Sequence, residues 1–292
     1  MAPPKLGGVS DTETSQATTT DTTSVAAPGA DRVGADSPGA EPRGAEPSGG
    51  VPVGPVPSSW WKALGVFDLE TTGIDVETAR IVTAHVGLID ATGASIAHGE
   101  WLADPGIEIP EQASAVHGIS TERARLEGRP AVEVVAEIIA ALRAVFARGV
   151  PLVVYNAPYD LTLLDREARR HGLEPLGDVG EIGCVVDPLV IDKAVDTYRK
   201  GKRTLEAAAG VYGVVLDDAH DAGADAVAAG RVAQAMAQKF PDRLDVPSTE
   251  LHDLQVGWCS TQAASFQDYM RRTKDPGFTT SGEWPHRSLP AS

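Results

Sequence analysis

Apolar and polar positions alternate along residues 61–102 in a way that predicts three successive strands. The strands are expected at 61–70, 80–90 and 94–102, with short polar turns between them and Gly93 in the second turn. Alternation with a period of two is typical of strands that bury one face. The short turns allow consecutive strands to pair directly, so this part of the chain predicts an antiparallel meander.

Beyond residue 110 the apolar spacing changes to that of helices. Residues 110–120 are expected to form a helical or loop segment, and apolar residues recur at helical spacing in 131–148. Short apolar runs at 151–156 and around 184–187 predict buried strands. Further helices are expected at 159–171, 189–198, 204–211, 222–240 and 248–272, with Ser248 capping the last and an irregular segment after it. Strands that alternate with helices after a meander indicate an α/β domain with a mixed sheet.

The first predicted strand ends in two acids, Asp68 and Glu70, followed by Thr71, Thr72 and Gly73. Side chains at positions i and i+2 of a strand point to the same face, so the two carboxylates project together. Two acids at a buried strand end repel each other and lose hydration, which a hard divalent cation between them would relieve. On its own, an acid pair of this kind is only weak evidence for a metal site.

Acids also occur at the starts of two predicted helices. Asp160 follows Asn156 and Tyr159 after a buried strand, and Asp225 follows His220 at the start of the 222–240 helix. Each position also has an ordinary structural explanation. An acid in a first helical turn is stabilised by the helix dipole, and a single histidine in a loop is common.

The composition separates an N-terminal segment from the rest of the chain, and the charge limits the kinds of partner that the protein can bind. Residues 1–58 contain no Phe, Tyr or Trp and are rich in Thr, Ser, Ala, Gly and Pro, which predicts a disordered tail. The formal charge of −16 argues against a nucleic-acid partner. Two clusters of basic residues weaken this argument against nucleic acid. One lies in the predicted 159–171 helix and the other near residue 200. The second is a candidate phosphate contact or a solvated charge run. Their members are Arg166, Arg169 and Arg170, and Arg199, Lys200, Lys202 and Arg203.

The cysteine content and the apolar segments indicate a cytoplasmic protein without a membrane anchor. Cys184 and Cys259 are the only cysteines, so neither a disulfide framework nor a zinc knuckle is expected. No apolar stretch has the length of a membrane-spanning helix, and the N-terminus lacks the layout of a secretion signal.

Three segments together resemble the motifs of the DnaQ-like (DEDDh) 3′–5′ exonucleases, which include the proofreading subunit of bacterial DNA polymerase III, ribonuclease T and oligoribonuclease. The segments are Phe67-Asp68-Leu69-Glu70-Thr71-Thr72-Gly73, Asn156-x-x-Tyr159-Asp160 and His220-x-Ala222-x-x-Asp225. The resemblance covers residues 62–240 and extends to exonuclease-domain proteins of bacteria with GC-rich genomes. It implies a ribonuclease-H-like mixed sheet flanked by helices, with an exonuclease domain at 59–242. A C-terminal helix and an irregular tail would then occupy 243–292.

The resemblance also implies a chemistry. Asp68, Glu70, Asp160 and Asp225 would hold two Mg²⁺ or Mn²⁺ ions about 4 Å apart, with Asp68 between them and Asp160 acting through water. His220 would take the proton from the attacking water, since imidazole titrates near neutral pH. The expected products are nucleoside 5′-monophosphates. The residues expected to bind the substrate are Thr71, Thr72, Gly73, His117, Asn156 and Tyr159; His117 lies in a segment, 116–119, that also resembles the family.

The expected substrate is the 3′ end of a single strand, with DNA favoured over RNA. A polymerase subunit as partner and a homodimer are both consistent with the resemblance. The alternatives are a polymerase-associated proofreading or end-binding module and an oligoribonuclease-type RNA exonuclease. The 248–272 helix is a further candidate, as a docking element for a partner.

Overall fold

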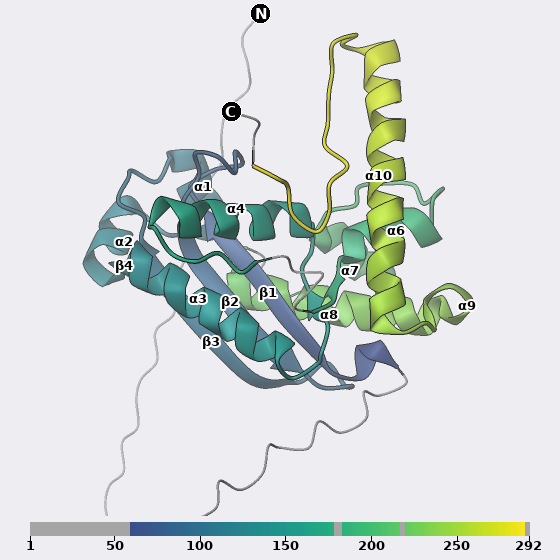
Figure 1. Ribbon diagram of the computed structural model, residues 1–292, viewed down its shortest axis with the longest axis horizontal. Helices are drawn as coiled ribbons and strands as arrows, with labels where there is room; N and C mark the ends of the chain where they lie inside the picture. Colours follow the sequence, from purple (N-terminus) through teal and green to yellow (C-terminus); the bar gives the residue numbers. More distant parts are fainter. Residues whose placement is uncertain (1–58, 178–182, 217–219, 290–292) are drawn as a thin grey trace, which may run out of the picture. The chain divides into compact units, whose positions relative to one another are not determined.

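The first three strands form the antiparallel meander that their alternating pattern predicts (Figure 1). The computed structural model describes residues 59–177, 183–216 and 220–289. The tail expected at 1–58 lies outside the described residues. The meander consists of β1 (Leu64–Thr71), β2 (Ile81–Ile89) and β3 (Ser95–Asp104). Strand β1 starts later than expected because Trp60–Lys62 form a short 3-10 helix, in which the buried Trp60 donates a hydrogen bond from Nε1 to the Leu244 carbonyl (2.8 Å).

Parallel strands extend the meander on both sides into a mixed sheet of order β4-β3-β2-β1-β5-β6. Strands β5 and β6 pair parallel to β1 and to β5, respectively, at the two predicted buried runs. Both are only two residues long, because the chain after β5 turns into a helix at Asn156. The sequence did not predict β4, which pairs parallel to β3. The bounds are β4 (Arg129–Pro130), β5 (Leu152–Val153) and β6 (Val185–Val186).

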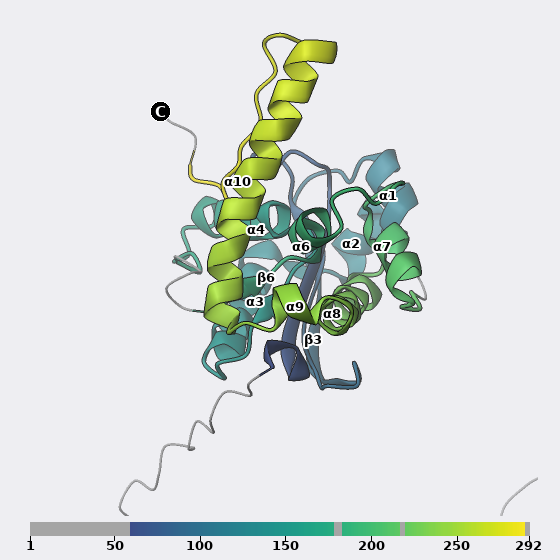
Figure 2. The ribbon, with the colours of Figure 1, turned by 90° about the vertical axis from the view of Figure 1, so that its right-hand side faces the viewer.

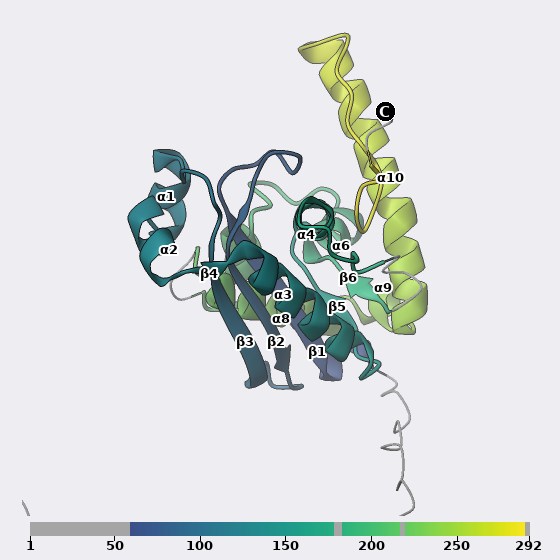
Figure 3. The ribbon, with the colours of Figure 1, turned by 60° about the vertical axis from the view of Figure 1, so that its left-hand side comes forward.

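Helices cover both faces of the sheet (Figure 3). Helices α3 (Ala131–Phe146) and α4 (Ala157–Arg170) lie on one face, and α8 (Ala222–Lys239) lies on the other. Along β1, Phe67 and Leu69 belong to the core beneath α3 and α4, whereas Leu64 and Val66 belong to the core beneath α8. The alternation therefore directs the side chains at 68 and 70 to the α8 side.

Helix α8 packs closely against the sheet because small residues face the strands. A Cβ atom on Gly230 would lie 2.7 Å from Cγ1 of Val66, so only glycine permits this approach. The remaining shorter helices confirm most of the predicted helical segments, and no described helix is long and apolar enough to cross a membrane. These helices are α1 (Glu111–His117), α2 (Thr121–Glu127), α6 (Pro188–Val195), α7 (Leu205–Tyr212) and α9 (Pro241–Leu244).

The long helix α10 (Ser248–Thr273) stands beside β6, and its C-terminal half extends beyond the sheet (Figures 1 and 2). His252 accepts a hydrogen bond from the Val185 amide (3.1 Å), and Gln255 accepts one from the Asp187 amide (2.7 Å). The expected cap is wrong: Ser248 is the first helical residue, and the cap position holds Pro247, without a side-chain hydrogen bond. The chain after α10 returns along the helix to α4, where Trp284 is buried.

Candidate active site

Four acids from three elements meet at the carboxyl end of β1. Asp68 and Glu70 come from the strand, Asp160 from the first turn of α4 and Asp225 from the first turn of α8. Atoms of Glu70, Asp225 and His220 lie within 4.8 Å of one another. Asp68 completes the group, because its charge interacts with those of Asp160, Asp225 and Glu70. The structure thus brings together the acids and the histidine that the sequence singles out.

Burial without a counter-charge raises the pKa of all four acids. Burial is the largest cause at each position, and the repulsion of neighbouring acids adds to it. The pKa of Glu70 rises to about 8, through burial and then through Asp225 and Asp221. In the described part of the chain, no lysine or arginine forms an ion pair with any of the four.

The donor set fits a hard divalent cation. Oδ1 of Asp225 is buried and has no hydrogen-bond partner among the described residues, so a ligand position there is open. Carboxylate oxygens are the ligands that Mg²⁺ and Mn²⁺ prefer. The backbone of His220 adopts a left-handed conformation (φ 72°), and its amide donates to Oδ2 of Asp225 (3.3 Å). Asp221, which the sequence analysis did not single out, caps α8 by accepting from the Ala224 amide (2.9 Å).

A cavity of about 870 Å³ opens beside the acids. All six residues expected to bind the substrate line it, together with Glu70. Its walls are mostly apolar, and its mouth includes the left-handed Asn156. The apolar wall residues include Leu69, Ile74, Pro110, Ala113 and Val116. A cavity of this kind suits a flat apolar group with a polar edge, such as a nucleobase.

The turn after β1 is held by its own side chains. Tyr159 donates its hydroxyl hydrogen to the Gly73 carbonyl and also contacts the Thr71 hydroxyl. Oγ1 of Thr72 accepts from the Arg80 amide (2.9 Å), so this buried hydroxyl fixes the turn. Burial raises the pKa of Tyr159 to about 12, so the phenol remains a donor at neutral pH. His117 accepts from the Ile119 amide through Nδ1 (3.2 Å), and burial lowers its pKa.

Asp187 positions the start of α4 and was missed by the sequence analysis. Its two carboxylate oxygens accept from the amides of Asn156 and Ala157, each at 3.0 Å. Trp284 Nε1 donates to the same carboxylate (3.3 Å). Asp187 is fully buried, which raises its pKa although these backbone bonds oppose the shift. The sequence signal was only an acid at the end of a two-residue strand.

The C-terminal segment adds Arg287 to the lining of the cavity. The Arg287 amide donates to Oγ1 of Thr162 on α4 (2.9 Å), and Arg166 donates to the Ser288 carbonyl (2.7 Å). Arg166 is itself buried and pairs with Glu77 (2.9 Å). Of the first basic cluster, Arg166 therefore fastens the C-terminal segment to α4, whereas Arg169 pairs with Asp165 and Arg170 with Glu167. The segment's own Arg287 lines the cavity.

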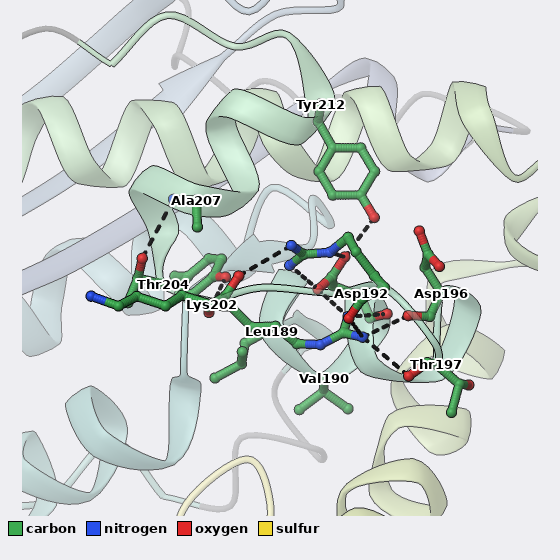
Figure 4. Close-up of polar contacts among 12 residues, drawn as sticks. Leu189, Val190, Asp192, Asp196, Thr197, Lys202, Thr204, Ala207 and Tyr212 are labelled. Carbon is green, nitrogen blue, oxygen red and sulfur yellow. Dashed lines mark hydrogen bonds and ion pairs between the residues drawn. The ribbon is translucent and has the colours of Figure 1, made fainter.

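The arginines of the second basic cluster bind a buried acid (Figure 4). Asp192 of α6 is fully buried and pairs with Arg199 (2.7 Å) and Arg203, and Tyr212 donates its hydroxyl hydrogen to it (2.6 Å). Burial opposes ionisation of Asp192, but hydrogen bonds from Arg199, Tyr212 and Arg203 outweigh it and lower its pKa. We call these four residues the Asp192 cluster. Arg199 and Arg203 fit neither the candidate phosphate contact nor the alternative of a solvated charge run, because they pair with Asp192 and their side chains are only 8% and 15% exposed. Lys200 and Lys202 are exposed.

Unpaired acids at the end of the central strand of a ribonuclease-H-like mixed sheet, beside a nucleotide-sized cavity, define a nuclease-type hydrolase. A family model described as Exonuclease (RNase_T) matches residues 66–233, more than half of the chain, and the chain belongs to this family. The matched region ends before α9 and α10.

Two bacterial relatives are large DNA polymerases. The chain is 29% identical over 180 residues to DNA polymerase III PolC-type of Lacticaseibacillus paracasei, covering 59% of this chain and 11% of that protein. It is 28% identical over 174 residues to the protein of the same name from Streptococcus thermophilus, covering 57% and 10%. The chain thus spans about a tenth of the length of these relatives.

Solved structures of Exonuclease I share the fold. The chain aligns with E. coli Exonuclease I in complex with a dA16 oligonucleotide at a TM-score of 0.53 and 20% identity, covering 63% of this chain and 42% of that one. The zinc-bound form of the E. coli enzyme with single-stranded DNA aligns at a TM-score of 0.54, also at 20% identity and with the same coverage. These likenesses confirm the predicted mixed sheet flanked by helices.

Proposed function

We propose that the protein is a divalent-metal-dependent 3′–5′ exonuclease that releases nucleoside 5′-monophosphates from single-stranded nucleic acid, with DNA preferred over RNA. The observation that carries this proposal is the position of the four unpaired acids beside a cavity that all six expected substrate residues line. Membership of the exonuclease family supports the reaction class.

The ions of the proposal are Mg²⁺ or Mn²⁺, held by Asp68, Glu70, Asp160 and Asp225. When bound, two such ions supply positive charge that stabilises the attacking and leaving oxygens of an in-line displacement. The unpaired Oδ1 of Asp225 and the mutual repulsion of the acids support this assignment.

The residues around the cavity and His220 have separate roles in this proposal. The cavity would take the terminal nucleotide, with Ile74 and Val116 against the base and the 71–73 turn against the sugar. The turn is fixed by the Tyr159 hydroxyl before any substrate arrives, so little ordering is needed on binding. His220, exposed beside Glu70 and Asp225, would take a proton from the attacking water and release it to solvent.

Two of the comparisons with known proteins support the proposed preference for DNA. The curated relatives are named DNA polymerases, and the solved neighbours include Exonuclease I with single-stranded DNA. The same relatives favour a second candidate function, a proofreading module that associates with a polymerase. The chain matches only about a tenth of those relatives, so this association is a proposal of its own.

A digestion experiment tests the proposed reaction. Matched 20-nucleotide DNA and RNA strands, labelled at the 5′ end, would be incubated with the protein and Mg²⁺ or Mn²⁺, with EDTA as the control. We expect a ladder that shortens from the 3′ end, faster on DNA and absent with EDTA. An intact strand that is nevertheless bound tightly would identify an end-binding module instead. Faster digestion of RNA would point to the oligoribonuclease type.

Replacement of His220 tests the proposed base. His220→Ala should lower kcat by about 10²–10⁴-fold, the usual contribution of a positioned general base. Binding of Mn²⁺, measured by isothermal titration calorimetry, should persist because the four carboxylates remain. Unchanged turnover at neutral pH would remove His220 from the reaction.

A further inference from the structure

A basic and aromatic groove lies between α6 and α10. It is an open cavity of about 770 Å³, and its aromatic lining residues are Trp258, Phe266 and Tyr269. None of the described residues that line it is acidic, although the chain as a whole carries a charge of −16. The cationic lining residues are Lys193, Arg203, Arg243 and Arg272. We call this cavity the α10 groove.

Three of the four cations are available to a ligand. Arg203 is engaged with Asp192, but Lys193, Arg243 and Arg272 form no ion pair within the described residues. Phe266 and Tyr269 are each 50% exposed, and the Phe266 ring also meets Phe278 edge to face (ring centroids 5.5 Å apart). Positive charge interleaved with exposed aromatic rings is the combination that binds single-stranded nucleic acid, because phosphates meet the cations and bases stack on the rings.

Shared lining residues connect the α10 groove with the catalytic cavity through a third cavity. A smaller cavity of about 200 Å³ lies between them and shares Asn156 and Arg287 with the catalytic cavity. It shares Lys193, Gln262 and Phe266 with the groove. A strand leaving the catalytic cavity therefore has a lined path toward the groove.

The two acids along this path are already occupied by protein groups. Asp187 is buried and accepts from backbone amides, as described above. Glu283 accepts from the Ser288 amide (3.0 Å) and from its hydroxyl (2.9 Å). The path thus carries two cations without an ion-pair partner among the described residues, Arg287 and Lys193, against the single exposed carboxylate of Glu283.

We propose that the α10 groove binds the part of a single strand that lies 5′ of the scissile bond. The inference rests on the proposed function, because an exonuclease acting at a 3′ end has all of its substrate except the terminal nucleotide on that side. The lining residues shared along the path to the catalytic cavity, and the absence of acids among the described residues that line the groove, favour a nucleic acid over a protein partner. The groove uses α9 and α10, which lie outside the matched family region, so strand binding here is an addition to the exonuclease unit.

Two substrates of different length separate the groove from the catalytic site. A 20-nucleotide oligothymidylate reaches the groove, whereas thymidine 5′-(p-nitrophenyl phosphate) does not. In Arg243→Glu/Arg272→Glu, we expect the ratio of kcat/KM for the long strand to that for the ester to fall at least tenfold. The dependence of log Kd on log salt should also weaken by about 1.4, roughly 0.7 for each lost phosphate contact.

The aromatic side chains are tested separately. Tyr269→Ala should weaken binding of the long strand about tenfold through loss of stacking, and Tyr269→Phe should retain binding. The matched charge control is Arg148→Glu, an exposed arginine after α3 that lines neither cavity. Hydrolysis of the ester by each variant also reports that its fold and catalytic site are intact.

The outcomes distinguish the two proposals. If the wild-type protein hydrolyses both substrates and the groove variants keep the wild-type ratio and salt slope, the groove does not bind the strand. If the wild-type protein hydrolyses neither substrate with Mg²⁺ or Mn²⁺, the proposed function itself fails, whatever the groove binds.

Discussion

Two groups of acids in the same domain, one half-buried and one fully buried, have opposite electrostatic character. At the end of β1, four acids lie together without a cation, and burial raises their pKa values. In the Asp192 cluster, a single acid meets two arginines and a tyrosine, and its pKa is lowered. Buried charge that is paired within the chain is structural, whereas buried charge left unpaired requires a ligand or a reaction to justify it.

The comparison also explains why linear charge patterns mislead. The run of basic residues near 200 suggests a phosphate contact, yet half of it is bound to Asp192. The basic groove instead collects Lys193, Arg243 and Arg272 from three helices. Charge that is adjacent in sequence is neutralised here, while charge that is dispersed in sequence gathers on one surface.

The largest effect is expected from the unpaired cluster. Asp68→Asn should lower kcat by roughly a thousandfold, because the proposed ions, which this acid would hold, would supply several kcal/mol of charge stabilisation. The metal-free melting temperature should stay equal or rise, since one repulsive charge is gone. Ester hydrolysis and thermal melting measure the two effects. Full activity in this variant would show that the four acids are not the catalytic site.

The paired cluster should respond in the opposite way. Asp192→Ala leaves Arg199 and Arg203 in a nearly dry site without their partner, so the free energy of unfolding should fall by about 3 kcal/mol. Urea denaturation measures it, and activity per folded molecule should persist. Asp196→Ala is the control, because Asp196 accepts from Arg203 through its backbone carbonyl, which the substitution retains. A loss of activity without a loss of stability would contradict the structural role.

A smaller effect is expected from pH in the metal-free protein. The folded acids hold protons more tightly than unfolded acids, whose pKa is about 4. Their contribution to stability is therefore complete below about pH 4 and is lost as pH rises toward the Glu70 pKa of about 8. In EDTA, the melting temperature should fall by a few degrees between pH 5 and pH 8, and Mg²⁺ should restore it. Glu70→Gln should reduce this fall in the melting temperature. A melting temperature that rises with pH would contradict the raised pKa values of the folded acids.

The smallest effect is expected at the exposed lysine of the basic run. Lys200→Ala should change the free energy of unfolding by less than about 0.5 kcal/mol, as is usual for surface substitutions. The affinity of the Lys200→Ala variant for the 20-nucleotide strand should equal that of the wild-type protein, whereas the Arg243→Glu/Arg272→Glu variant should bind more weakly. A clear loss of affinity, measured by fluorescence anisotropy, would restore the loop as a phosphate contact.

The sequence predicts those features that depend on local periodicity. Alternation along β1 places Asp68 and Glu70 on one face, and helix starts place Asp160 and Asp225 near the strand end. Asp187 and Trp284, which are 97 residues apart, meet only through tertiary packing. Arg287 is brought to the cavity by that same packing, so no local pattern marks it.

Strand β4 escaped prediction for a related reason. Its two residues, Arg129 and Pro130, are exposed and carry no alternating pattern. They extend the sheet only because their backbone pairs with Ala103 and Asp104 of β3. Short strands of this kind are defined by their neighbours rather than by their own side chains.

The side chains of α10 along β6 have a consequence for how the protein behaves in concentrated solution. His252 and Gln255 bind the outward-facing backbone groups of Val185 and Asp187, where a further strand would otherwise pair. An uncovered edge of this kind invites strand addition from another molecule and then aggregation. A chain shortened before α10 should therefore self-associate through β6, and light scattering would detect the loss of this protection.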